Sequence, residues 1–251
     1  MPLIQSLPGC PLDIIGDVHG CYRSLLALIE QLPHKFDSKI CFVGDLIDRG
    51  PASADVVELV RARGYDAVMG NHEKRFVGNA KTALRCAKTG KFTSSNDPYA
   101  FFSLDESWLF NNGGEATLAS YYRHGGVKQC KEHLRFVSQL PIYLEYDLHD
   151  ESGRALVVSH SAVGRMWRLR HDAERAKSFA AHVLSGRGDD SANDGIFNVY
   201  GHTPVKKPVI TEFSANIDLG CVYKKHWGEK ARLCALEFPS KKIFTQECID
   251  F

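Results

Sequence analysis

The chain has 251 residues, of which 44% are hydrophobic, and its 31 lysines and arginines nearly balance its 30 aspartates and glutamates. This length is ample for the core of one large α/β domain. The net charge of +1 argues against a nucleic-acid duplex or an anionic membrane as the main partner, because the protein lacks the overall positive charge that attracts such polyanions. Any anionic ligand must therefore be bound by local groups.

The cysteines and the amino-terminal segment indicate the compartment. Eight cysteines occur without a C-x-x-C pair, and several lie within apolar runs, so we interpret them as reduced thiols. Residues 1–8 lack the basic and long apolar segments of a secretion signal. No later run approaches the ~18 apolar residues of a membrane span. We therefore expect a soluble, cytoplasmic protein with no membrane partner.

The first predicted unit is a strand, a loop and a helix. Residues 12–15 form an apolar run that predicts a strand, and the loop at 16–20 follows it. Apolar residues at positions 25, 28, 29 and 32 have the spacing of one helix face, and Pro33 ends that helix.

Two further units repeat this order. A strand at 39–43 leads into the loop at 44–50, and a helix follows that Ser53 could cap and Gly64 could end. A third strand at 66–69 ends in the sequence GNHE. Strand, loop and helix thus alternate three times, which predicts a sheet covered by helices.

The segment 74–135 breaks this alternation and contains no clear strand, so we interpret it as a helical lid inserted into a single domain of residues 1–251. Its aromatic residues, including Trp108 and Tyr121, are expected to pack in the core. After it, strands are predicted at 142–146, 155–158 and 197–200, with a polar helical region between the last two. The closing strands, expected to be antiparallel, are at 209–211, 216–218, 233–237 and 242–245.

Five of the predicted strands end in side chains that can bind metals or phosphate. They are Asp17 with His19, Asp45 with Asp48 and Arg49, Asn71 with His72, then His160, then His202. One such residue is more often structural, but ligands bind at the carboxyl ends of strands in α/β sheets, and the recurrence predicts one shared site. Oxygen and imidazole donors without thiolate suit manganese, iron or zinc. Six donors can hold two neighbouring cations if one carboxylate bridges them.

These motifs resemble those of the phosphoprotein phosphatase family of binuclear metallophosphatases. The likeness rests on GDVHG at 16–20, GDLIDRG at 44–50, GNHE at 70–73, SH at 159–160 and GHT at 201–203. It is greatest to the branch that includes the bacterial and phage serine/threonine phosphatases and the symmetrical dinucleoside tetraphosphatases. The resemblance implies a calcineurin-like metallophosphatase sandwich of two β-sheets flanked by helices, with a helical lid.

The resemblance also implies roles for individual residues. One metal would be held by Asp17, His19 and Asp45, and the other by Asp45, Asn71, His160 and His202. Manganese is our first choice for both, with iron and zinc as alternatives, and a hydroxide bridging the metals would attack phosphorus directly. His72 would protonate the leaving oxygen, Asp48 would orient the His72 ring, and Arg49 would bind phosphate oxygens.

A second phosphate-binding arginine is expected between the last two metal histidines. The candidates are Arg165, Arg168, Arg170, Arg175 and Arg187. The run at 183–187 best resembles the strand-end arginine of the family, although Trp167-Arg168 is a competing match. We select Arg187.

The predicted function is hydrolysis of phosphate monoesters, with phosphoserine or phosphothreonine in proteins as the leading substrate. A symmetrical bis(5'-nucleosyl) tetraphosphatase is the alternative, because the chain length and the stretch at 112–121 also resemble that group. Members of that group often lack the acid at Asp48, which favours the phosphomonoesterase. A binding module without catalysis would have damaged ligands, and all six are present.

Overall fold

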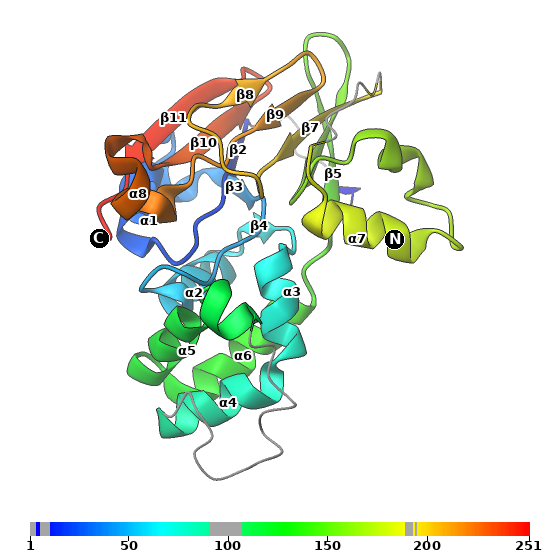
Figure 1. The fold of residues 1–251 in the computed structure, drawn as a ribbon. Coiled ribbons are helices and arrows are strands. Elements are labelled where there is room, and N and C mark those ends of the chain that lie inside the picture. The colour runs from blue at the N-terminus through cyan, green and yellow to red at the C-terminus, as the bar shows by residue number, and fades with distance from the viewer. Residues whose placement is uncertain (1–3, 6–10, 91–106, 189–192, 194) are drawn as a thin grey trace.

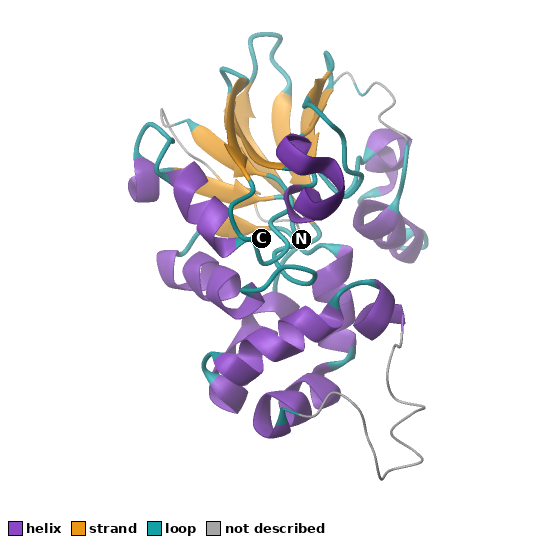
Figure 2. Cartoon of the chain, turned by 60° about the vertical axis from the view of Figure 1, so that its left-hand side comes forward, coloured by secondary structure: helices purple, strands orange, loops and turns teal. Residues whose placement is uncertain are grey.

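The protein is described here from a computed structural model, which defines residues 4–5, 11–90, 107–188, 193 and 195–251. Two mixed β-sheets occupy one end of the molecule, and a layer of helices occupies the other (Figures 1 and 2). The loops that leave the sheets toward this layer carry the polar residues singled out in the sequence.

The five-stranded sheet has the order β11-β10-β2-β3-β4. Its parallel strands are β2 (Leu12–Ile15), β3 (Lys39–Phe42) and β4 (Asp66–Ala67). The strands β10 (Arg232–Phe238) and β11 (Lys242–Glu247) form an antiparallel pair, and β10 runs antiparallel to β2. Ile15 pairs with Phe42, so the loops that follow β2 and β3 start side by side.

The six-stranded sheet has the order β1-β5-β6-β7-β9-β8. Its members are β1 (Ile4–Gln5), β5 (Tyr143–His149), β6 (Ala155–Ser159), β7 (Ile196–Tyr200), β8 (Val209–Ile210) and β9 (Ser214–Asn216). The expectation that the closing strands are antiparallel is confirmed for the β8–β9 and β10–β11 pairs, but β9 is parallel to its other neighbour, β7. The reason is that β8 reverses the chain, so β9 again runs in the direction of β7.

The core has two main parts, one on each face of the five-stranded sheet. Ile14 and Val43 pack against residues of the other sheet such as Val158, whereas Ile15 and Phe42 pack against helices. Neighbouring residues of one strand thus face opposite sides, and both sides are apolar, as in a sheet covered on both faces.

Helices α1 (Tyr22–Ile29) and α2 (Ser53–Arg63) follow β2 and β3 and pack on this sheet. The helical layer consists of α3 (Asn71–Gly78), α4 (Ala80–Thr89), η3 (Ser107–Asn111), α5 (Gly114–Arg123) and α6 (Gly126–Ser138), and it contacts α2 (Figure 1). Residues 91–106, part of the predicted insertion, lie outside the described residues.

The remaining helices are short or lie on the six-stranded sheet. Helix α7 (Ala176–Ser185) packs on that sheet through Phe179 and Val183. The short elements are η1 (Lys35–Asp37), η4 (Gly164–Leu169), η5 (Cys221–Tyr223), α8 (Lys224–Trp227) and η6 (Gly228–Lys230). Within the described ranges, no helix combines the length and apolar character that a membrane crossing requires.

Two local predictions have different outcomes at α2. Gly64 adopts the left-handed conformation, with φ of 64°, and ends the helix as predicted. Ser53 does not cap the helix; it is its first residue, and its hydroxyl accepts the backbone N–H of Asp48 at 3.1 Å. The predicted cap was wrong because the serine is used by the preceding loop.

Candidate metal centre

The loops after β2, β3 and β4 are bonded directly to one another. The backbone N–H groups of Val18 and His19 both donate to the carbonyl of Asp45, at 3.1 and 2.8 Å. A Cβ atom at Gly50 would lie 2.0 Å from the carbonyl oxygen of His19, so only glycine allows this approach of the loops. The first two loops therefore form one rigid surface.

Glu73 fixes the loop that contains Asp45. Its carboxylate accepts the N–H groups of Asp45 at 2.8 Å, Leu46 at 2.9 Å and Gly70 at 2.9 Å. Glu73 was not predicted as a site residue. It could have been recognised from its position as the third residue of α3, where a glutamate side chain commonly accepts the backbone N–H of the residue before the helix.

Four of the other five predicted ligands gather around the Asp45 carboxylate. Its oxygens are 3.6 Å from His19 Nε2 and 3.3 Å from His160 Nε2. The Nε2 atom of His160 is 3.0 Å from Asn71 Oδ1 and 3.1 Å from His202 Nδ1. The structure therefore brings Asp45, Asn71, His160 and His202 into one group, with His19 on the other side of Asp45.

Asp17 lies at the edge of this group. Its two carboxylate oxygens accept the backbone N–H of His202, each at 3.2 Å. The ligand atoms of His19 and Asp45 lie within 4.8 Å of those of His72, and Asp17 is not part of this group. The pairing of Asp17 with His19 on one metal therefore stays a prediction.

The orientation of the imidazoles fits bound cations. His19 Nδ1 donates to the carbonyl of Ile47 at 2.8 Å, and His160 Nδ1 donates to that of Val43 at 2.9 Å. With Nδ1 protonated, each Nε2 turns a lone pair inward, where His160 meets the acceptor oxygens of Asn71 and Asp45. At His160 these acceptors converge on one point, where a metal ion would satisfy them, whereas His19 Nε2 accepts from Arg49.

Charge in the site supports the same conclusion. Burial lowers the pKa of His160, and burial followed by the neighbouring His160 lowers the pKa of His202 to about 4, so both rings are neutral and able to ligate. Burial and then the charge of Asp218 raise the pKa of Asp17 well above its ordinary value. Burial also raises the pKa of Asp218 to about 7. Divalent cations stabilise buried carboxyl groups that lie this close together. Asp218 was not predicted as part of the site.

Arg49 places a positive group directly against the candidate ligands. Its guanidinium donates to the Nε2 atom of His19, and it lies 5.5 Å from the centre of the Tyr223 ring. Tyr223 was not predicted, since it lies in η5, a short turn without a motif.

His72 forms a buried pair with Asp48. Its Nδ1 atom lies 2.6 Å from Asp48 Oδ2, and Trp108 Nε1 and Thr117 Oγ1 donate to the same carboxylate at 2.7 and 2.6 Å. Burial alone would lower the pKa of His72, but the charge of Asp45 and the hydrogen bond with Asp48 outweigh it and raise the pKa. Trp108 and Tyr121 are buried as expected, but the role of Trp108 as a donor was not predicted.

Backbone strain is concentrated in the site. Seven non-glycine residues of the described chain have positive φ, and five of them are site candidates. These five are His19, Asp45, Asp48, Arg49 and His202. Strained conformations of this kind persist where the surrounding contacts hold functional groups in place.

A hollow of about 240 Å³ opens over the candidate ligands. Its lining includes Arg49, His72, Arg75, Arg187, His202 and Tyr223. Arg187 thus lies at the site, but it follows helix α7 and not a strand, so the predicted strand end was wrong. Of the competing arginines, Arg170 bonds Glu145 and Arg175 pairs with Asp172.

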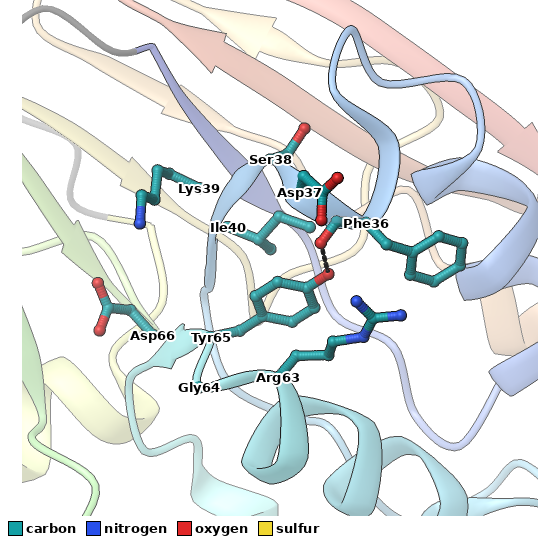
Figure 3. Close-up of a pocket in the computed structure, with 9 residues that line it drawn as sticks. All are labelled: Phe36, Asp37, Ser38, Lys39, Ile40, Arg63, Gly64, Tyr65 and Asp66. Atoms are coloured by element: carbon teal, nitrogen blue, oxygen red, sulfur yellow. Dashed lines mark hydrogen bonds between the residues drawn. The ribbon is translucent and has the colours of Figure 1, made fainter.

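Another hollow, of about 370 Å³, lies at the opposite end of β3 (Figure 3). Arg63 stacks over the ring of Phe36, and the Tyr65 hydroxyl donates to the Phe36 carbonyl at 2.8 Å. None of the predicted ligands lines this hollow, and its acids and bases are mixed, with Asp37 and Lys39 close together in the chain.

Comparisons with known proteins agree with this geometry. Residues 10–217 match the family model described as calcineurin-like phosphoesterase. Two relatives are named asymmetrical bis(5'-nucleosyl)-tetraphosphatase PrpE. The protein from Geobacillus sp. (strain WCH70) is 32% identical over 84% of this chain and 86% of its own, and that from Geobacillus thermodenitrificans (strain NG80-2) is 31% identical over 91% and 90%.

Among solved structures, one described provisionally as a diadenosine tetraphosphatase superposes with a TM-score of 0.60. It is 20% identical and covers 98% of this chain and 97% of its own. At this identity the match supports the fold alone.

The chain therefore belongs to the calcineurin-like phosphoesterase family, and it is a hydrolase of the metallophosphatase type. The predicted fold, an α/β sandwich of two sheets flanked by helices, is confirmed. The family uses divalent metals, and the two donor groups around Asp45 fit a binuclear site.

Proposed function

We propose that this calcineurin-like phosphoesterase hydrolyses dinucleoside polyphosphates, with asymmetrical cleavage of a dinucleoside tetraphosphate as its leading reaction. One observation carries the proposal: Arg49, Arg75 and Arg187 line the same hollow as His72. A phosphate monoester has a single phosphate to bind, whereas a polyphosphate chain has several, and guanidinium groups match phosphate oxygens in pairs. The names of the two Geobacillus relatives support the same substrate.

Arg75 is the residue that most favours a longer phosphate chain. Its Nη1 atom is buried and has no hydrogen-bond partner among the described residues, and the side chain lines the hollow. An unsatisfied buried donor costs free energy unless a ligand satisfies it. We infer that a phosphate beyond the one held by Arg49 accepts from Arg75.

The candidate ligands would hold two divalent cations. Asp17, His19 and Asp45 would bind one, and Asp45, Asn71, His160 and His202 the other. When bound, the cations would lower the pKa of water and withdraw charge from the phosphoryl oxygens. Manganese remains our first choice, with iron and zinc as alternatives, because oxygen and nitrogen donors accept all three.

His72 and Asp48 would handle the proton of the leaving group. The raised pKa of His72 favours the protonated ring, and its Nε2 atom is 3.8 Å from Asp45 Oδ2, close to the reacting centre. Asp48 holds the ring from the other nitrogen. The His72 side chain would therefore donate a proton to the departing oxygen, and Arg49 and Arg187 would orient the phosphate.

A serine/threonine protein phosphatase is the second candidate, and the His72–Asp48 pair is the observation that favours it. A serine or threonine alkoxide is a poor leaving group and requires a proton, whereas a nucleotide phosphate leaves readily without one. A well-formed proton donor is therefore needed more by a phosphomonoesterase.

We also propose that the chain is a single domain in which 74–135 is a helical insertion.

The deciding experiment compares substrates on one enzyme preparation. Metal-free protein is reloaded with Mn²⁺ and given diadenosine tetraphosphate, a phosphoserine peptide and an aryl phosphate. We expect the highest kcat/KM for the dinucleotide, with ATP and AMP as products. Formation of two ADP molecules would indicate symmetrical cleavage, and a preference for the phosphopeptide would support the second candidate.

Arg75→Gln tests the extra phosphate contact. Loss of one charge-assisted hydrogen bond of about 1.5–3 kcal/mol should raise KM for the dinucleotide by about tenfold or more. KM for the aryl phosphate, which has one phosphate, should not change. Arg63→Gln, in the hollow of Figure 3, is the matched control. Equal effects of Arg75→Gln on both substrates would refute the assigned contact.

A further inference from the structure

Three cysteines meet at one buried point outside the candidate metal centre. They are Cys21 at the start of α1, Cys221 in η5 and Cys248 directly after β11. Their Sγ atoms all lie within 4.8 Å of one another, and the residues are 0%, 1% and 3% exposed. We call them the thiol triad. The segments are far apart in sequence, so only the fold brings them together.

The spacing of the triad is close to that of a thiolate metal site. Zinc–sulfur bonds of about 2.3 Å place the sulfur atoms of a trigonal or tetrahedral site roughly 3.8–4.0 Å apart. The Sγ atoms need to approach by less than about 1 Å to reach this geometry. Small rotations of three side chains are sufficient, and no strand or helix has to move.

The chemistry of the triad differs from that of other buried cysteines in the chain. Cys41 and Cys234 lie among apolar side chains and contact a backbone carbonyl each. In the triad, the hydrogen bonds among the three thiols lower the pKa of Cys248 and raise the pKa of Cys21 and Cys221, so Cys248 is the group most readily converted to a thiolate. No disulfide is present among the described cysteines, so all three sulfurs are available as ligands.

We propose that the thiol triad binds one thiophilic closed-shell cation, Zn²⁺ or Cu⁺, as a structural site distinct from the candidate catalytic metals. Soft sulfur donors select such ions, whereas the oxygen and imidazole donors around Asp45 also accept harder cations such as Mn²⁺. Binding releases the thiol protons and needs no oxidant or reductant.

The site would connect three segments that support the candidate active centre. Cys21 follows His19 by two residues, and its thiol donates to the His19 carbonyl at 3.8 Å. Cys221 precedes Tyr223, whose ring lies beneath the Arg49 guanidinium. Two residues after Cys248, Asp250 accepts the N–H of Ser24 at 3.0 Å and so connects this segment to α1. An ion held by the triad would therefore stabilise the loops of His19 and Tyr223 relative to each other.

Thiolate ligation has a spectroscopic signature that the catalytic metals cannot give, because none of their six candidate ligands contains sulfur. Reduced, metal-free protein is titrated with Co²⁺, and the thiolate-to-cobalt charge-transfer band is followed. We expect one equivalent to produce this band in the wild type and in Cys234→Ala, a matched buried control. Cys248→Ala and Cys221→Ala should lose it.

A second measurement requires no variant. X-ray absorption of the wild-type protein that is first loaded with Mn²⁺ and then given one equivalent of Zn²⁺, or separately of Cu⁺, should show scattering from about three sulfur atoms around the added ion. Binding of one of the two ions with far higher affinity would identify the occupant. Absence of metal–sulfur scattering with both ions, or a thiol count that reveals a disulfide within the triad of the purified protein, would overturn the proposal.

Discussion

Replacing Asp48 by asparagine is expected to shift the pH dependence of turnover. All three groups that contact the Asp48 carboxylate are donors, namely His72 Nδ1, Trp108 Nε1 and Thr117 Oγ1. An asparagine with its amide oxygen at the Oδ2 position still accepts from His72 and Trp108, and its NH₂ group then faces the Thr117 hydroxyl, which can accept. The substitution therefore removes the negative charge beside His72 and leaves the hydrogen bonds in place.

The size and sign of the shift follow from these contacts. A hydrogen bond to a charged group contributes about 1.5–3 kcal/mol, and one pKa unit corresponds to about 1.4 kcal/mol, so the pKa of His72 should fall by about one to two units. A general acid is active below its pKa and loses its proton above it. The alkaline decline of kcat should therefore begin about one to two pH units lower in Asp48→Asn than in the wild type.

The assay compares two substrates across the pH range. An alkyl phosphate needs a proton on its leaving oxygen, so its turnover should follow the shifted decline. A nitrophenyl phosphate has a good leaving group and should be affected much less. Asp37→Asn, in the hollow of Figure 3, controls for the removal of a carboxylate elsewhere. An unshifted profile for the alkyl phosphate in Asp48→Asn would refute the proton-donor role of His72.

Three further substitutions test separate parts of the site and the core. His72→Asn should lower kcat by about 10²-fold or more while the metal content, measured by mass spectrometry, is retained; unchanged turnover would exclude the general-acid role. Asp45→Asn should lose bound metal together with activity, and a variant that stays fully loaded would contradict a bridging role. Asp13 is 3% exposed, and burial, with a further contribution from Glu237, raises its pKa to about 6. Since the folded-state pKa is raised, the stability contributed by the protonated form is present below the unfolded pKa and is lost as pH rises through about 6. Asp13→Asn should therefore increase the free energy of unfolding by about 1–2 kcal/mol at pH 8 and not at pH 4, as measured by urea denaturation; a gain of equal size at both pH values would count against this explanation.

Much of the site could be predicted because its residues follow apolar strands. Each buried strand requires a short run of apolar residues, and the polar residues of the site lie in the loop that follows the strand. Asp45 and His160 are therefore visible in the sequence as interruptions of apolar runs, although they follow β3 and β6, which belong to different sheets, and the packing of the two sheets brings these ends together. The structure places them 3.3 Å apart.

Other members of the site have no such signal. Tyr223 and Arg187 lie in or next to helical turns, where a polar or aromatic residue is usual. Arg187 was selected through the resemblance and a supposed strand end, and the strand is absent. The thiol triad could not be predicted either, because the spacing of Cys21, Cys221 and Cys248 along the chain contains no information about their separation in space.

The contacts of Asp48 explain why the helical layer belongs to the chemistry as well as to the fold. Two donors to its carboxylate, Trp108 and Thr117, come from that layer, about 60 and 70 residues away in sequence. Neither is marked by a motif, and Trp108 also packs against Phe76, so its apolar role alone accounts for its burial. These donors hold the buried carboxylate in place, and its hydrogen bond with His72, after the charge of Asp45, contributes to the raised pKa of His72. A change that loosens the packing of η3 and α5 should therefore reduce catalysis by weakening the His72–Asp48 pair, without altering any metal ligand.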